Sequence, residues 1–412
     1  MASYSTVPKE TEPLVAKKQS NKWIGAVAAI CLFSAVLGTY SRAGVEVQAP
    51  ASFSSTTGTF LWDVKLFPDG VNTLDISGDG TILAAGGIDE GQDYGAADAL
   101  LLDPASGEIV AKFPQPAEVV SLAIGSSLLA VGTAAHHSRP YQEIPLYNLT
   151  TRTKINTLNA CAGKYFVSAL NFRRDTDWLA AGCLVGNGPE GAVEVFKSLS
   201  SNATWRADGI RVNAVAWSRD GQKLVVGGVP NDGGNSLRFY DAESGQLLHD
   251  IIFADGSAVN TIAFSPDGKH LAVGGESPEI VVIDAQRYFI VDKEAQDSST
   301  FSLDFDAGSS LAAGVFDQVL VYGHDGKYFE QEIAPPGSNV DINKIVWSPT
   351  EAGLLFAGSS DGHVRAFRVP SPPTMAPTLT PATPSPTHHH ESDAAAPFAA
   401  SAAVGLLALV AF

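Results

Sequence analysis

The sequence predicts an all-β fold, a β-propeller of seven blades with four strands each, and two observations support this. One pattern recurs seven times: alternating apolar residues, a polar turn, then a small apolar run ending in glycine. The copies begin at Val71, Val119, Val167, Val212, Val259, Thr300 and Ile342, so they are 48, 48, 45, 47, 41 and 42 residues apart. A period of about 40–50 residues with alternation inside it is typical of a propeller blade.

Each copy divides into recognisable elements, most clearly in VNTIAFSPDGKHLAVGG at 259–275. Its first half alternates as an inner strand, Ser-Pro-Asp-Gly at 265–268 predicts a turn, and the small apolar run predicts a second strand. We expect the large side chains of the inner strands to fill the space between blades. We expect the glycine ending each second strand to let the chain turn sharply into the next loop.

The last copy supplies only three strands before the chain reaches a Pro-rich segment after Val369. Phe60, Trp62, Val64 and Leu66 alternate just before the first full blade, so they predict the missing outer strand. A ring closed in this way leaves no exposed sheet edge. The predicted propeller therefore covers 59–369 and is closed by its N-terminal strand.

Two segments carry a family resemblance. SLRFYDAESGQLL at 236–248 is similar to the third strand, turn and fourth strand of WD40-repeat propellers, and GSSDGHVRAF at 358–367 resembles their Ser-x-Asp-Gly turn. The blades lack the Gly-His start and the Trp-Asp end of that family, and Tyr240-Asp241 is one of the pairs standing in for the latter. The resemblance implies a divergent WD40-like propeller over 59–369. Quinone-dependent and lactonase-type propellers share such blade patterns.

The composition argues against several classes of function. With 26 Lys+Arg against 44 Asp+Glu the net charge is −18, which disfavours binding to nucleic acid. The three cysteines show no CxxC or Cys/His spacing typical of zinc, and no phosphate-binding loop or hydrolase motif occurs. We therefore expect no cofactor, no metal and no catalytic residues.

The N-terminal part predicts a membrane anchor. Residues 23–40 carry no charge and would span roughly 27 Å as a helix. Lysines precede this segment, so 1–22 is predicted to be a cytoplasmic tail and 41–58 an exported linker. The uncharged run is longer than the apolar core of most cleaved signal peptides, which favours an uncleaved signal anchor over a cleaved signal peptide. Either alternative places the propeller in the secretory lumen or outside the cell.

The C-terminal part predicts a stalk and a hydrophobic tail. Residues 370–393 are rich in Pro, Ser and Thr, a composition that stays extended. Residues 394–412 are apolar and small, and resemble a lipid-anchor (GPI) signal with Ser392, Asp393 or Ala394 as attachment point. A membrane helix and an Ala-rich tail without a membrane role are the alternatives.

Loop length points to a binding face. The connections between second and third strands are long in the first four blades, at 87–99, 133–143, 183–191 and 228–235. They emerge on one side of the ring, which we call the long-loop face, and long loops on a rigid scaffold commonly bind partners. The candidate partner-binding residues are Asp89, Glu90, Asp93, His136, His137 and Arg139.

These features predict a membrane-tethered, non-catalytic module that binds a protein or a glycan. The alternative is a lactonase-like or other cation-dependent hydrolase, with Glu276 and Asp317 near the channel. Three or more oxygen ligands converging at the channel mouth would favour the hydrolase. A channel lined by apolar and hydroxyl groups would favour the binding module.

Two kinds of covalent modification are consistent with the predicted export. Asn148 and Asn202 begin Asn-x-Thr motifs between third and fourth strands, so we expect glycans on the face opposite the long loops. Cys161 and Cys183 bracket two adjacent strands of the third blade, and a disulfide between them is predicted. The alternative is a pair of free, buried thiols.

Overall fold

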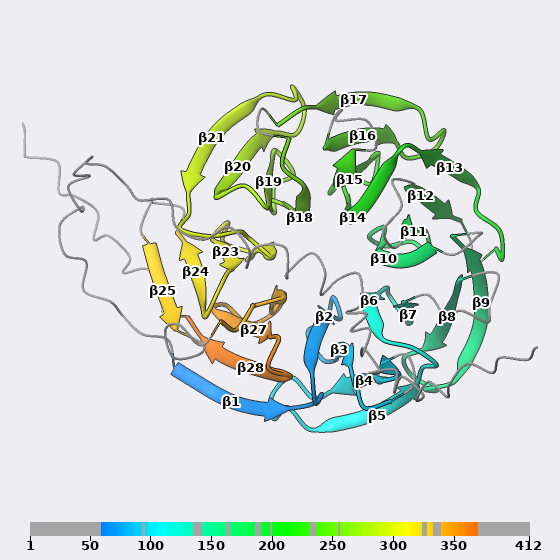
Figure 1. Ribbon diagram of the computed structural model, residues 1–412, viewed down its shortest axis with the longest axis vertical. Coiled ribbons are helices and arrows are strands. Elements are labelled where there is room, and N and C mark those ends of the chain that lie inside the picture. Colours follow the sequence, from blue (N-terminus) through cyan, green and yellow to red (C-terminus); the bar gives the residue numbers. More distant parts are fainter. Residues whose placement is uncertain are drawn as a thin grey trace, which may run out of the picture. The chain divides into compact units, whose positions relative to one another are not determined.

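The computed structural model describes residues 59–92, 95–134, 142–161, 165–185, 191–197, 200–230, 236–253, 256–323, 328–332 and 339–369. These residues form seven antiparallel four-stranded sheets arranged as a ring (Figure 1). The predicted seven-bladed all-β propeller is confirmed. No helix within the described ranges is long and apolar enough to cross a membrane. The predicted anchor, linker, stalk and tail lie outside the described residues.

The strands follow one order in each blade, from the channel to the rim. The innermost strands are β2 (Gly70–Ile76), β6 (Val119–Ile124), β10 (Tyr165–Phe172), β14 (Ile210–Trp217), β18 (Val259–Phe264), β22 (Ser302–Phe305) and β26 (Lys344–Trp347). The second strands are β3 (Leu83–Ile88), β7 (Leu128–Thr133), β11 (Leu179–Val185), β15 (Lys223–Pro230), β19 (His270–Gly275), β23 (Leu311–Gly314) and β27 (Leu354–Gly358).

The outer half of each blade completes the sheet. The third strands are β4 (Asp98–Leu102), β8 (Gln142–Asn148), β12 (Gly191–Phe196), β16 (Leu237–Asp241), β20 (Glu279–Asp284), β24 (Gln318–Tyr322) and β28 (His363–Arg368). The outer strands are β5 (Ile109–Pro114), β9 (Lys154–Ala160), β13 (Trp205–Asp208), β17 (Leu247–Ile251), β21 (Ile290–Ala295), β25 (Tyr328–Glu332) and β1 (Thr59–Lys65). Blades are numbered 1 to 7 from β2.

The ring closes through β1, as predicted from its alternating residues. β1 is the outer strand of blade 7 and pairs with β28 in antiparallel register, from Thr59↔Arg368 to Lys65↔His363. The Trp62 indole then donates a hydrogen bond to the Pro104 carbonyl of blade 1, at 2.9 Å. The first strand of the described chain thus holds the last blade to the first.

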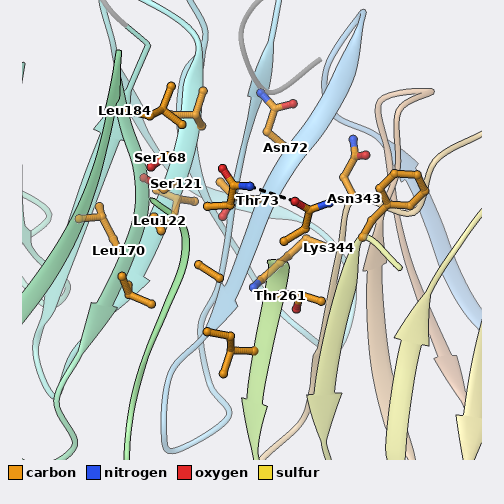
Figure 2. Close-up of a pocket in the computed structure, with 18 residues that line it drawn as sticks. Asn72, Thr73, Ser121, Leu122, Ser168, Leu170, Leu184, Thr261, Asn343 and Lys344 are labelled. Carbon is orange, nitrogen blue, oxygen red and sulfur yellow. Dashed lines mark hydrogen bonds between the residues drawn. The ribbon is translucent and has the colours of Figure 1, made fainter. Parts of the chain in front are cut away.

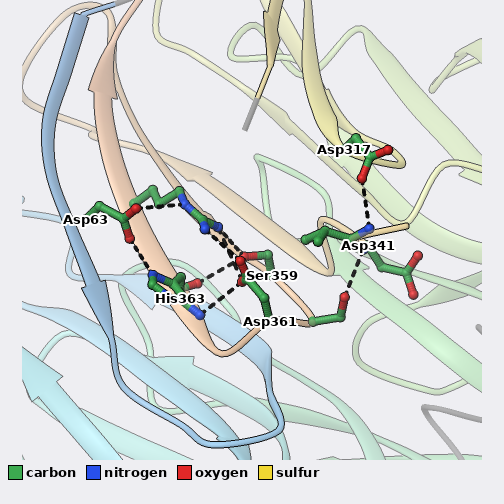
Figure 3. Close-up of polar contacts among 9 residues, drawn as sticks. Asp63, Asp317, Asp341, Ser359, Asp361 and His363 are labelled. Atoms are coloured by element: carbon green, nitrogen blue, oxygen red, sulfur yellow. Dashed lines mark hydrogen bonds and ion pairs between the residues drawn. The ribbon is translucent and has the colours of Figure 1, made fainter. Parts of the chain in front are cut away.

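Charged side chains reinforce the closure (Figure 3). Asp63 on β1 lies 2.6 Å from His363 Nδ1 and accepts a hydrogen bond from Arg365 Nε at 3.2 Å, both on β28. The buried Arg365 guanidinium also donates to Ser359 Oγ and to Asp361 Oδ2, each at 2.6 Å. Hydrogen bonds from Arg365 and Ser359 lower the pKa of Asp361 to about 2, although burial opposes them. The Asp361 carboxylate therefore stays charged at neutral pH, beside the contact between β1 and β28.

The core lies between blades. Seven clusters of buried apolar side chains each span one interface, or seam, between neighbouring blades. Trp217 and Phe264, from equivalent places in two repeats, are both buried in such clusters. The large residues of the inner strands thus fill the space between sheets, as the repeat predicts.

The repeated glycine has a different role from the predicted one. These glycines lie inside the second strands, and none is among the described glycines with positive φ, so they do not turn the chain. A Cβ on Gly86 would lie 2.3 Å from Val119 Cγ1, and one on Gly358 would lie 2.5 Å from Val71 Cγ1. The glycine therefore makes room for the first residue of the next blade's repeat. The predicted turning role is wrong because these glycines have the extended backbone of a strand.

Blade 3 contains the disulfide. Cys161 and Cys183 are bonded, with their Cα atoms 5.4 Å apart, and both are buried in the seam between blades 2 and 3. The Cys161 backbone N–H donates to the buried Glu194 carboxylate at 3.0 Å. Arg206 on β13 pairs with the other oxygen of Glu194 at 2.7 Å. The bridge and the ion pair together connect the inner and outer strands of this blade.

Candidate functional site

A cavity of about 170 Å³ occupies the channel at its long-loop end (Figure 2). The second residue of every repeat lines it: Asn72, Val120, Ser168, Asn213, Asn260, Phe301 and Asn343. In blades 1 to 5 this residue is the extra one in a β-bulge between the first and second strands. A bulge re-aims a side chain, which explains how a residue inside an alternating strand comes to face the channel.

The polar side chains at this level connect neighbouring blades. Asn72 Nδ2 donates to the Val119 carbonyl of blade 2 at 3.1 Å, and Asn343 Nδ2 donates to the Val71 carbonyl of blade 1 at 2.8 Å. Asn213 Nδ2 donates to Asn260 Oδ1 at 3.0 Å. Partly buried hydrogen bonds of this kind help to fix the relative positions of the blades. The mouth of the channel is therefore a braced, largely preformed surface.

Two carboxylates lie further along the inner strands. Asp75 Oδ2 accepts a hydrogen bond from Ile124 N of blade 2 at 2.6 Å, and Asp304 Oδ2 accepts one from Trp347 N of blade 7 at 2.8 Å. Burial raises the pKa of each to about 6, and the nearby Lys344 ammonium partly opposes this rise. Both carboxylates bridge seams, which gives them a structural role.

Glu118 connects the channel mouth to the first long loop. It is buried just before β6 and accepts a hydrogen bond from Asn72 Nδ2 at 2.9 Å. Burial raises the pKa of Glu118 to about 7; the Asn72 bond opposes this rise, and the charge of Glu90 adds to it. The charge of Glu90 on the loop thus adds to the rise in the pKa of a group at the channel mouth.

The structure describes two of the six predicted partner-binding residues. Glu90 is exposed on the connection after β3, and its N–H donates to Asp69 Oδ2 at 2.8 Å. Asp89 is partly exposed and its carboxylate accepts the N–H of Gly91 at 3.0 Å. Both therefore lie on the long-loop face. Asp93, His136, His137 and Arg139 lie outside the described residues.

The structure shows backbone contacts for Glu276 and Asp317, the two residues of the hydrolase alternative. Asp317 exchanges two hydrogen bonds with Val340: its carboxylate accepts one at 2.8 Å (Figure 3), and its N–H donates the other at 2.7 Å. The Glu276 N–H donates to the Ala258 carbonyl at 3.2 Å. In the part of the chain that the structure describes, no three His, Cys, Asp or Glu side chains are grouped to hold a metal ion.

The two Asn-x-Thr motifs lie at the opposite end of the strands from the long loops. Asn148 ends β8 and its Oδ1 accepts the N–H groups of Thr150 and Thr151, at 3.0 and 2.7 Å. Asn202 is exposed just before β13. Glycans at either residue would leave the long-loop face free.

Sequence reasoning missed the channel-lining amides. Asparagine occupies the second position in four of the seven repeats, at Asn72, Asn213, Asn260 and Asn343. That recurrence at an otherwise variable position was the available signal. Simple alternation does not assign this position to the channel, because the bulge that turns it there is a departure from alternation.

Comparisons with known proteins agree with the fold. Residues 246–284 match the family model described as WD domain, G-beta repeat. No curated protein sequence matches the chain. A chain from a structure titled "Crystal Structure of Mitotic Checkpoint Complex" shares 19% identity and superposes with a TM-score of 0.62, covering 81% of this chain and 98% of that one. At this identity the likeness concerns the fold. The predicted resemblance is thus confirmed: the chain is a seven-bladed β-propeller that carries a WD40 repeat.

Proposed function

We propose that this protein is a membrane-tethered, non-catalytic interaction module that binds a protein or glycan partner through the long-loop face of blades 1 to 4. The observation that carries the proposal is the braced channel mouth beneath that face, where Asn72 and Asn343 join successive blades. WD40 propellers typically bind protein partners, so the fold supports the same class of function. Because the ring is rigid, the scaffold loses little conformational entropy when its loops bind a partner.

Charge and exposure support the choice of face. Asp89 and Glu90 lie at the start of the first long connection, and Glu118 lies beneath them with a pKa of about 7. A partner with donor groups would find carboxylates and amides side by side here. Polar recognition of this kind suits a protein surface or the hydroxyls of a glycan.

The tether rests on the sequence. Residues 23–40 supply the anchor and 370–393 the stalk, which would hold the propeller away from the bilayer on the luminal or extracellular side. The tail 394–412 adds a second attachment, as a lipid-anchor signal or a membrane helix. Glycans on Asn148 and Asn202 would then occupy the face turned away from the partner.

The experiment compares partner capture by the full-length chain with capture by two loop variants, one shortened within 87–99 and one within 133–143. Detergent extracts from the native host are the source of partners, and melting curves check that each variant folds. Arg174→Ala, an exposed substitution in the turn between β10 and β11, is the control on the opposite face. Loss of a reproducible partner with either shortened loop, and retention with the control, is expected. Equal recovery with all forms would refute the choice of face.

A separate measurement tests the tether. Membranes from the native host are washed at high pH and then treated with an N-glycosidase. The protein is expected to stay with the membrane and to lose mass on treatment. Release by the wash, or a mass insensitive to the glycosidase, would contradict this part of the proposal.

A further inference from the structure

A groove of about 700 Å³ opens between blades 5 and 6, beside β21, the outer strand of blade 5, and β24, the third strand of blade 6 (both labelled in Figure 1). It extends from the β18–β19 turn, at Asp267, to Asp297, two residues after the end of β21. The buried side chains of Leu311 and Leu320 form part of its floor. The groove lies on other blades than the long loops, so a ligand bound in it would be independent of the proposed function.

Blade 5 differs from blades 1 to 4 at one register position beside the groove. In blades 1 to 4 the outer-strand residue opposite the buried third-strand position is apolar and packs in the seam with the next blade: Phe113, Leu158, Ala207 and Ile251. In blade 5 the residue in this register, opposite Ile280, is Glu294. A carboxylate cannot enter an apolar seam without a partner, because its desolvation is costly. Blade 5 therefore leaves the outer half of this seam open.

The two faces of β21 have opposite character. Asp292, Glu294 and Gln296 alternate along the strand and its end, and all three line the groove. Lys293 points to the other side, where it pairs with Glu279 at 2.7 Å and lines a pocket toward blade 4. Side chains alternate between faces along a strand, so the strand presents carboxylates on the groove side and places its one lysine on the opposite side.

The described residues that line the groove include one histidine, His270, and no lysine or arginine. Asp292, Glu294 and Asp297 are exposed and form no salt bridge with a lysine or arginine of the described residues. The Oε1 atom of Gln296 is buried and has no hydrogen-bond partner within the described chain. Gln296 Nε2 donates to the Tyr322 hydroxyl, and burial together with the charge of Glu294 raises the pKa of Tyr322. Within the described residues, Asp292 Oδ1 accepts the backbone N–H of Lys293, at 2.9 Å. Carboxylates without a cationic partner, placed over an apolar floor, are complementary to cationic donors.

We propose that this groove binds an extended segment of a partner protein rich in arginine or lysine. The aliphatic stems of the basic side chains would cover Leu311 and Leu320, and their charged ends would meet Asp292, Glu294 and Asp297. A donor from the segment would satisfy Gln296 Oε1. β21 has six residues, a length of roughly 20 Å, so about six extended residues of the partner would fit along it.

Fluorescence anisotropy of a labelled eight-residue peptide of alternating arginine and alanine tests the proposal, with the full-length chain in non-ionic detergent. The double variant Asp292→Asn/Glu294→Gln is expected to bind about tenfold more weakly than the unchanged chain at low salt. The matched control, Glu108→Gln/Asp250→Asn, removes two charges from the outer edges of blades 1 and 4 and should leave affinity unchanged. Melting curves check the folding of both.

A charge reversal distinguishes a site from general attraction to an acidic protein. Asp292→Lys/Glu294→Lys should bind a peptide of alternating glutamate and alanine, which the unchanged chain should not bind. Equal weakening in the groove variant and the control would show attraction to the net charge alone and overturn the proposal. Unaltered affinity in both, or failure of the reversed variant to bind the acidic peptide, would also overturn it.

Discussion

Near the channel, the seam between blades 7 and 1 and the seam between blades 5 and 6 are built from the same contact. The glycine of the second strand approaches the first residue of the next repeat, Gly358 against Val71 and Gly274 against Thr300. At the rim they diverge. Trp62 of β1 packs onto the apolar cluster between blades 7 and 1, whereas no residue of β21 joins the described cluster between blades 5 and 6.

This difference shows how the repeat divides its tasks. The inner half of every seam follows from the repeated residues, because each blade needs the same close approach to close the ring. The outer half depends on a single register position that the ring does not require to be apolar, as Glu294 shows. The rim is therefore where one blade can acquire a binding surface at modest cost in stability.

The closure seam should be the most sensitive to change. Deleting 58–67 removes β1, so β28 is left as an exposed edge and the contacts of Trp62 and Asp63 are lost. We expect a loss of more than about 5 kcal/mol and of the cooperative thermal transition, measured by calorimetry. Deleting 44–53 in the predicted linker is the length-matched control. An unchanged melting profile would disprove closure by β1.

Near the channel, Gly→Ala should lower the stability of the protein to a similar extent in the seam between blades 4 and 5 and in the open seam between blades 5 and 6. A Cβ on Gly227 would lie 2.3 Å from Val259 Cγ1, between blades 4 and 5, and one on Gly274 would lie 2.9 Å from Thr300, between blades 5 and 6. Each substitution should cost up to about 3 kcal/mol in chemical denaturation, because the seam is overpacked. Gly78→Ala, which meets nothing within 4 Å, should be nearly neutral. A neutral Gly274→Ala would show that the groove reaches the channel.

The seams also differ in the group that accepts a backbone N–H. Asp75 bridges blades 1 and 2 and Asp304 bridges blades 6 and 7, whereas the hydroxyl of Thr261 accepts Leu303 N at 2.9 Å between blades 5 and 6. The folded pKa of both carboxyls, about 6, exceeds the ordinary 3.8. The folded state therefore binds more protons between these values, and this stability is lost as the pH rises from about 4 through 6.

The expected effect is about 3 kcal/mol for each carboxyl, measured by urea unfolding at a series of pH values. Asp75→Asn/Asp304→Asn should flatten the profile between pH 4 and 6. Glu118, with a folded pKa of about 7, extends the same trend to higher pH, and Glu118→Gln should remove that part only. A profile of unchanged slope in the double variant would contradict the assignment.

The smallest expected effect is a gain. Glu294→Leu would restore at the open seam the apolar register position of blades 1 to 4, and should raise the unfolding free energy by about 1 kcal/mol. The affinity of the same variant for the arginine–alanine peptide should also fall. Leu158→Glu, the reverse change in blade 2, should destabilise the ring, since Leu158 is buried there. A Glu294→Leu variant less stable than the unchanged chain would show that the groove is not an unfilled seam.

The sequence by itself determined the number of blades, their order and the closure. A repeat of about 45 residues with alternation and turn residues encodes local geometry, and the three-strand last copy leaves one place for the strand at Thr59–Lys65. Part of the candidate site was also visible, because Asp89 and Glu90 follow directly from loop length.

Only the tertiary structure decided what the repeated positions do. The role of Gly86 depends on Val119 in the next blade, and the role of Asn343 depends on Val71, 272 residues away in the chain. The bulges that turn Asn72 and Asn213 toward the channel, and the open seam beside Glu294, likewise arise between strands rather than along them. A period in sequence specifies each blade, but only contacts between blades determine which side chains become core, channel or groove.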